Sequence, residues 1–226
     1  MAVSYVNSGQ NFGTGTAITI PKPVGIQTGD AVVVQVVSDS TPSISDNNGS
    51  APFSVDASYT HYANAARTFI LSRIAGSQEP SAFSFTLSAA NSWAAVVSIY
   101  RGVDASIWRI GPSGHFSTSF NTVPSSPIIS SGLISGDMLI GVYSGDTNYN
   151  ILASTPSGYT ARQHTYGSRE ASFVDKLVTS TSQSSAVWTL SGSTSWAAGL
   201  FAIKQGNTFD TKPFFYAQYL KCFGGV

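Results

Sequence analysis

Two short apolar runs, each opened by Gly-Asp, stand out in the hydrophobic pattern of this 226-residue chain. The first covers residues 29–37 (GDAVVVQVV) and the second covers residues 136–143 (GDMLIGVY). Each run is too short for a helix and follows a turn signal, which is typical of a buried strand. The glycine of each pair suits the turn, and we expect the aspartate to bond to nearby backbone amides rather than to a ligand. These residues are Gly29, Asp30, Gly136 and Asp137.

A second pair of matching segments indicates that a larger unit is repeated. The pattern FTLS followed by SWAA, which contains Trp93, returns as WTLS followed by SWAA, which contains Trp196. These segments are 103 positions apart, whereas the Gly-Asp pairs are 107 positions apart, so the copies differ by four residues between the Gly-Asp strand and Arg73. A surface loop tolerates such a change in length. We therefore interpret the chain as an internal duplication of one domain of about 100 residues.

Short strand candidates recur along both copies, with turns between them and almost no helical periodicity. This pattern predicts an all-β fold with two tandem antiparallel β-sandwich domains of jelly-roll or immunoglobulin-like type, and at most a turn or two of helix. The predicted domains are residues 1–106 and 107–206. Part of residues 105–127 should supply the first strand of the second domain.

Within the first copy, we expect several separate strands. Residues 3–6 and 17–20 are predicted to be two strands joined by a turn at Gly13-Thr14-Gly15. Residues 83–87 alternate between apolar and polar positions, which predicts one buried and one solvated face. A further strand, residues 93–100, closes the domain.

The last segment, residues 207–226, resembles neither copy and holds six aromatic residues. So many aromatic side chains do not stay exposed on a soluble monomer without causing association. The segment either folds back as an extra edge strand or docks on a neighbouring subunit, and we favour docking in a symmetric homo-oligomer such as a trimer. The aromatic residues of this predicted interaction arm are Phe209, Phe214, Phe215, Tyr216, Tyr219 and Phe223.

The low charge of the chain argues against two classes of partner. Charged residues make up 10% of the sequence and the formal net charge is zero, so there is no electrostatic footprint for nucleic acid. No apolar stretch approaches the roughly 20 residues of a membrane helix, so we expect no membrane insertion. The first residues lack the basic and apolar segments of a signal peptide, which predicts a protein that is made in a cytoplasm and does not use the general secretion route.

No motif in the sequence predicts catalysis, a cofactor or a metal site. The carboxylates include no close pair that would suggest a glycosidase, and there is no Gly-x-Ser-x-Gly motif. The single cysteine, Cys222, cannot form an intrachain disulfide. The three histidines, His61, His115 and His164, lack metal-ligand spacing. We interpret His61 and His164 as exposed loop residues.

Two other groups of residues could bind a ligand. Clusters of Asp and Asn at residues 39–48 and 146–150 could hold calcium, although such clusters are common in ordinary turns. Trp93 and Trp196 could stack on sugars, but their repetition favours a place in the core.

A mixture of tyrosine with Ser, Thr, Asn and Gly characterises several loops. It occurs in residues 59–62 and 143–149, and Tyr159 and Tyr166 lie in similar surroundings. This mixture suits a polar, adaptable contact surface. Simple solvated loops are the alternative.

The order of these repeated features resembles a β-sandwich repeat of tailed-phage and prophage structural proteins, many of them tail-associated or on the virion surface. The first copy carries Glu79-Pro80 and residues 100–104 (YRGVD), and the second carries residues 156–159 (PSGY). Each copy therefore has part of the pattern, and the resemblance covers about residues 25–204. It implies a fold and a setting, with other virion proteins as partners, and it implies no catalytic residue.

The prediction is thus a non-enzymatic structural or binding protein of a tailed-phage virion, located in the particle. It would be a small tail-fibre or baseplate component or a capsid decoration protein, with a host-surface glycan as a possible ligand. The alternative is a carbohydrate-binding adhesin module outside a virion, which would gather aromatic side chains on one exposed face. A glycan-cleaving enzyme would need two carboxylates that converge in a cleft.

Overall fold

The structure, a computed structural model, describes residues 1–49, 52–104, 109–110, 116–129, 132–180, 183 and 185–206, with only the backbone described at 109–110. These residues form strands joined by turns, and the only helix among them is a 3-10 turn, η1 (Tyr62–Asn64). No helix in the described part of the chain is long and apolar enough to cross a membrane. The strands are β1 (Ser4–Pro21), β2 (Ala31–Asp39), β3 (Ile44–Asp46), β4 (Ser54–Thr60), β5 (Ala66–Ile74), β6 (Ala82–Arg101), β7 (Arg109–Ile110), β8 (Phe116–Asn121), β9 (Met138–Gly145), β10 (Leu152–Ser154), β11 (Thr160–Thr165), β12 (Glu170–Leu177), β13 (Thr189–Leu190) and β14 (Thr194–Ile203).

Two six-stranded antiparallel sheets make up most of the molecule, which confirms the predicted all-β sandwich class. The first sheet has the order β1-β6-β2-β5-β4, with β3 also paired to β6. The second has the order β11-β12-β9-β14-β7, with β8 also paired to β14. Read in the opposite direction, the second sheet repeats the order of the first, and β8 supplies the expected early strand of the second half. An internal duplication predicts this agreement, and the common origin of the halves stays an interpretation.

The first half departs from the prediction in having two very long strands. Residues 4–21 form one strand, β1, and residues 82–101 form one strand, β6, so the predicted turn at Gly13-Thr14-Gly15 is wrong. The backbone stays paired and is bent at a register shift between Gly15 and Ala17, where Gly15 has a φ of +119°. Residues 87–90 of β6 lie opposite Thr16 alone, so the pair of strands bends here without either strand ending. The bend carries the far half of the β1–β6 pair over the outer face of its own sheet.

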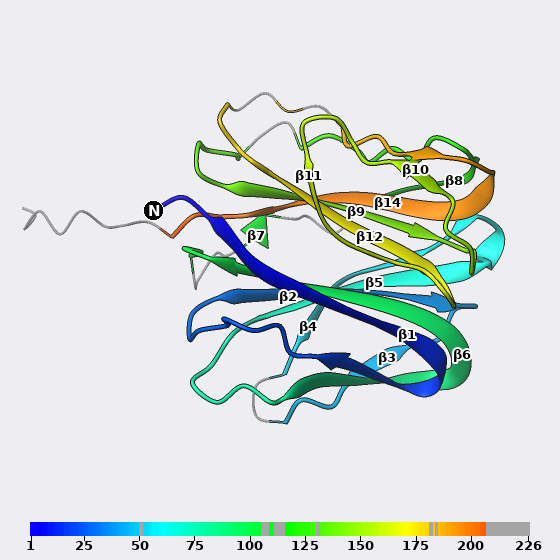
Figure 1. Cartoon of the computed structure of the whole chain (residues 1–226), viewed down its shortest axis with the longest axis horizontal. Helices are drawn as coiled ribbons and strands as arrows, with labels where there is room; N and C mark the ends of the chain where they lie inside the picture. The colour runs from blue at the N-terminus through cyan, green and yellow to red at the C-terminus, as the bar shows by residue number, and fades with distance from the viewer. Residues whose placement is uncertain are drawn as a thin grey trace, which may run out of the picture.

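The two sheets pack face to face, as the stacked layers of Figure 1 show. This packing explains why the sequence of β2 is apolar without alternation, because both faces of the strand are covered. Val32, Val34 and Val36 face the core of the first half, while Val33 and Val37 face the second sheet. Strand β9 is divided in the same way, with Ile140 and Val142 in the shared cluster and Leu139 in the core of the second half. Each fully buried Val or Ile contributes about 2 kcal/mol, so the contact between the sheets is a core of its own.

The outer face of each sheet is covered by residues of its own half. Trp93 is buried in the first of these cores and Trp196 in the second, as their repetition predicted. The glycine within the second apolar run, Gly141, also has a packing reason. A Cβ at this position would lie 2.8 Å from Val174 and 3.2 Å from Trp188.

Both Gly-Asp pairs form the same turn, with glycine φ angles of +90° at Gly29 and +99° at Gly136. Asp30 accepts a hydrogen bond from the Gln27 amide (2.8 Å), and Asp137 accepts one from the Ile134 amide (2.9 Å). Each carboxylate also pairs with a basic residue at the end of the closing strand: Arg101 is the last residue of β6, and Lys204 directly follows β14. The two ion pairs are Asp30–Arg101 (2.8 Å) and Asp137–Lys204 (2.7 Å). These aspartates therefore join segments within their own half of the chain.

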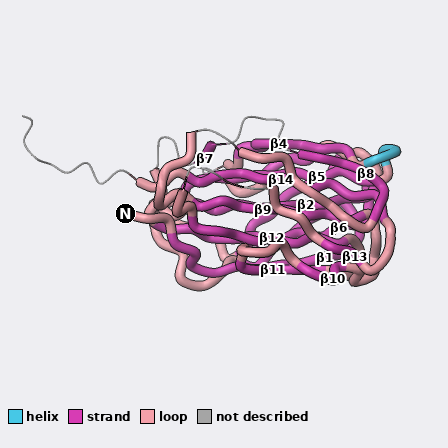
Figure 2. The backbone as a smooth tube through the Cα atoms, turned by 90° about the horizontal axis from the view of Figure 1, so that it is seen from above, coloured by secondary structure: helices cyan, strands magenta, loops and turns pink. Residues whose placement is uncertain are grey.

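The described chain ends lie together at one end of the molecule, which we call the terminal end (Figures 1 and 2). The Met1 ammonium donates a hydrogen bond to the Gly206 carbonyl at 3.3 Å. The opposite end, which we call the loop end, carries η1, the end of β8 and the turns that follow β9 and β11. The chain ends and these loops therefore lie at opposite ends of the molecule.

Candidate binding site at the loop end

The exposed aromatic side chains gather at the loop end. Among the described residues, five aromatic side chains are exposed: Phe12, Tyr62, Phe120, Tyr149 and Tyr166. They come from β1, η1, β8, the loop after β9 and the turn after β11. The large exposed side chains at the terminal end, such as Val24 and Leu177, are aliphatic. Because soluble proteins rarely expose aromatic side chains in a group, this distribution marks a contact surface.

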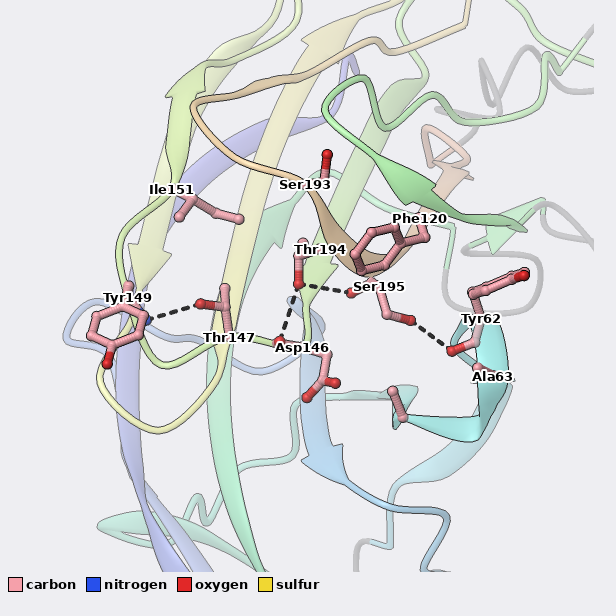
Figure 3. A pocket seen from close by; sticks show the side chains of 11 residues that line it. Tyr62, Ala63, Phe120, Asp146, Thr147, Tyr149, Ile151, Ser193, Thr194 and Ser195 are labelled. Carbon is pink, nitrogen blue, oxygen red and sulfur yellow. Dashed lines mark hydrogen bonds between the residues drawn. The ribbon is translucent and has the colours of Figure 1, made fainter.

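A cleft with a volume of about 700 Å³ opens among three of these aromatic residues. Tyr62 comes from the first half of the chain, and Phe120 and Tyr149 come from the second (Figure 3). Tyr62 and Tyr149 lie at opposite sides of the cleft, with Phe120 and Ser193 between them. The cleft thus exists only because the two halves are packed together.

Hydrogen bonds hold the lining segments in place. Ser195 donates from its hydroxyl to the Tyr62 carbonyl at 2.8 Å, which ties the second half to the first. Thr194 donates to the Asp146 carbonyl at 3.1 Å, and the Tyr149 amide donates to the Thr147 hydroxyl at 3.1 Å. The lining is therefore preformed, as is usual for ligand sites.

A buried carboxylate anchors the loop that carries Tyr149. Glu170 is fully buried and accepts hydrogen bonds from the Ile151 amide (3.2 Å), the Leu152 amide (3.1 Å) and the Tyr143 hydroxyl (2.8 Å). Burial and the negative charge of Glu170 raise the pKa of Tyr143 well above its ordinary value, so this hydroxyl remains a donor. His164 lies 3.0 Å from the same carboxylate. It belongs to strand β11, so the prediction of an exposed loop histidine is wrong at this position.

An arginine links the two halves beside the cleft. Arg169 lies 2.6 Å from the Asp39 carboxylate and 3.2 Å from the Asp146 carboxylate. Burial raises the pKa of Asp146, and the charge of Asp39 adds to this effect while Arg169 opposes it. Of the two carboxylates, only Asp146 lines the cleft. The guanidinium is thus occupied by residues of the protein itself.

The prediction for His61 is also wrong, because this side chain is buried between the two sheets. Its Nε2 atom lies 2.8 Å from the Thr68 hydroxyl and 3.1 Å from the Ser144 hydroxyl of the other half. Burial lowers the pKa of His61 to about 4, and the nearby Arg169 acts in the same direction. His61 directly follows β4, and its side chain contacts the second sheet at Ser144. Local loop signals do not reveal this contact, because Ser144 is distant in the sequence.

In each of the two predicted clusters of Asp and Asn, an aspartate bonds to other residues of the protein. In the first, Asp46 accepts hydrogen bonds from the Asn48 side chain and from the Phe53 amide. In the second, Asp146 pairs with Arg169, and Asn148 and Asn150 are exposed. No group of three or more His, Cys, Asp or Glu within the described ranges could hold a metal ion.

Several predicted residues lie outside the part of the chain that the structure describes. These are His115, Cys222 and all six aromatic residues of the predicted arm: Phe209, Phe214, Phe215, Tyr216, Tyr219 and Phe223.

The tyrosine-rich loops were a useful signal only in part, because Tyr143 belongs to β9 and is fully buried, and Phe120 was missed. The predicted loops contain both Tyr62 and Tyr149, and the structure brings them to the same cleft. Phe120 lies four residues after Phe116 in β8, so both project from one face of the strand. Phe116 stacks on Tyr59 at 4.2 Å in the inter-sheet core, and Phe120 continues the same face into the cleft. The two phenylalanines four residues apart were the signal in the sequence that could have identified Phe120.

Comparison of the chain with protein-family models, with curated proteins and with solved structures found no match.

Proposed function

We propose that this chain is a non-enzymatic binding protein of a tailed-phage virion that presents its loop end to a ligand. The observation that carries the binding role is the concentration of all five exposed aromatic side chains of the described residues at one end. The resemblance of residues 25–204 to phage structural repeats supports the virion as the setting.

The arrangement of the two ends supports an attachment at the terminal end. The described chain leaves the fold at Gly206, beside Met1, so residues 207–226 begin at the end opposite to the cleft. Phe209 and Phe214 are among the aromatic residues through which this arm would join other virion proteins or further copies of the chain. One end would then fix the protein while the other remains free to bind.

The cleft favours binding over hydrolysis. Cleavage of a glycosidic bond ordinarily uses two carboxylates on either side of the bond. Among the described residues, Asp146 is the only carboxylate that lines the cleft, and it is paired with Arg169. The cleft therefore offers contacts to a ligand without an acid–base pair.

The same grouping of aromatic residues also favours the second candidate, an adhesin module that works outside a virion. The two candidates share the loop end and differ in where the protein resides. Mass spectrometry of gradient-purified particles distinguishes them. A virion protein will be recovered in a fixed ratio to the major capsid protein. Recovery only in the soluble fraction of the lysate would contradict the virion assignment.

A further inference from the structure

The shape of the cleft suits an extended ligand. Tyr62 and Tyr149 are 57% and 71% exposed at opposite sides of the cleft, and Phe120, 58% exposed, lies between them (Figure 3). These side chains do not enclose a single point, as the rings of an aromatic cage around a small cation would. They form separate apolar platforms along an open cleft, so the ligand should offer a flat apolar face at intervals.

A few polar groups lie between the platforms and offer hydrogen bonds. The Asp146 carboxylate and the exposed hydroxyl of Ser193 line the cleft, together with Thr147. A ligand that fits must therefore combine apolar faces with a rim of hydrogen-bonding groups. A pyranose ring has this character, because its C–H face packs on an aromatic ring while its hydroxyls point sideways to polar groups.

The charges at the cleft restrict the ligand further. Among the described residues, the lining contains one carboxylate and no lysine or arginine. The guanidinium of Arg169, which reaches Asp146, is paired with both Asp39 and Asp146. A phosphate or carboxylate on the ligand would meet Asp146 without a free cation to balance the repulsion. The site therefore disfavours phosphorylated chains and acidic sugars.

From this geometry we infer that the loop-end cleft binds a neutral oligosaccharide of several sugar rings, stacked on Tyr62, Phe120 and Tyr149. This inference rests on the proposed binding function and names its ligand class. The carboxylate of Asp146 accepts hydrogen bonds from sugar hydroxyls. The ligand spans both halves of the chain, so binding depends on the packing of the two sheets.

The test is an array that displays neutral hexose and N-acetylhexosamine oligosaccharides beside uronic-acid oligosaccharides of equal length. We expect the full-length chain to bind neutral glycans and to bind them better as the length grows from one ring to several. Tyr62→Ala and Tyr149→Ala should each weaken binding at least about tenfold, as loss of an aromatic contact at a binding centre does. Tyr62→Phe keeps the ring and should bind within about twofold of the native chain.

Val24→Ala is the matched control, because it removes an apolar side chain that is 78% exposed at the terminal end. It should bind as the native chain does. Preference for the acidic glycans, or binding that survives both tyrosine variants, would overturn the proposal. Absence of binding to every glycan on the array would also overturn it. In that case, tyrosine-dependent binding of the protein to bacterial cells would leave the proposed function standing with a ligand of another class.

Discussion

Lowering the pH from about 7.5 to about 4.5 should destabilise the folded chain through a single buried histidine, His61. This residue has an ordinary pKa of 6.5 and a pKa of about 4 in the fold, because it is buried between the sheets. At intermediate pH the unfolded chain takes up a proton at His61 and the folded chain does not. The contribution to stability is therefore complete above the ordinary pKa and is lost as the pH falls towards 4.

The magnitude follows from the two pKa values. A difference of one pKa unit corresponds to about 1.4 kcal/mol, so the free energy of unfolding should fall by about 2.5 kcal/mol over this pH range. For a chain of this size, such a change corresponds to a drop in melting temperature of about 5–10 °C. The effect belongs to the contact between the halves, because His61 bridges Thr68 of the first and Ser144 of the second.

Chemical denaturation at a series of pH values measures this effect, with His61→Gln as the reference. Glutamine can still form hydrogen bonds with Thr68 and Ser144 but does not titrate. Other groups, such as Asp146 and Asp175, have raised pKa values and act in the opposite sense, since protonation favours their folded state. Their contribution is common to both proteins and cancels in the difference. Parallel loss of stability in the native chain and the variant would refute this role of His61.

Three further predictions concern the fold and the arm. Asp137→Ala should lower the free energy of unfolding by about 3 kcal/mol, because the carboxylate pairs with Lys204 and accepts a hydrogen bond from the Gln205 amide. Denaturant titration measures this change, and an unchanged midpoint would contradict the prediction. Residues 1–104 expressed alone should aggregate, since Val33 and its neighbours would be exposed; a monodisperse monomer with cooperative unfolding would oppose the shared core. Light scattering should show a homo-oligomer for the full chain and a monomer for a chain that ends at Gly206; equal masses per chain would argue against docking by the arm.

The sequence was sufficient to predict the all-β fold class and the matching turns and strands of the two halves. The Gly29-Asp30 turn and the buried Trp93 follow from local chemistry and from repetition, and both have counterparts in the second half. The continuous strand β1 could not be predicted in this way. Gly13 and Gly15 resemble a turn locally, and only pairing with β6 keeps the backbone extended through them.

The candidate site was predictable only in part, because it is formed by segments distant in the sequence. Tyrosine-rich loops indicated Tyr62 and Tyr149, but nothing local places these loops side by side. Their proximity follows from the face-to-face packing of the two sheets. The same packing buries His61, which local signals placed in solvent, and it explains why both faces of β2 are apolar.

We propose the loop end as the binding surface, and binding of the protein to whole cells is the decisive test of this claim. The measurement is the binding of fluorescently labelled full-length protein to the bacterium in which the phage multiplies. We expect saturable binding that falls at least about tenfold in a Tyr62→Ala/Tyr149→Ala double variant and is unchanged in Val24→Ala. Native-level binding by the double variant, with the fold intact by circular dichroism, would contradict the claim.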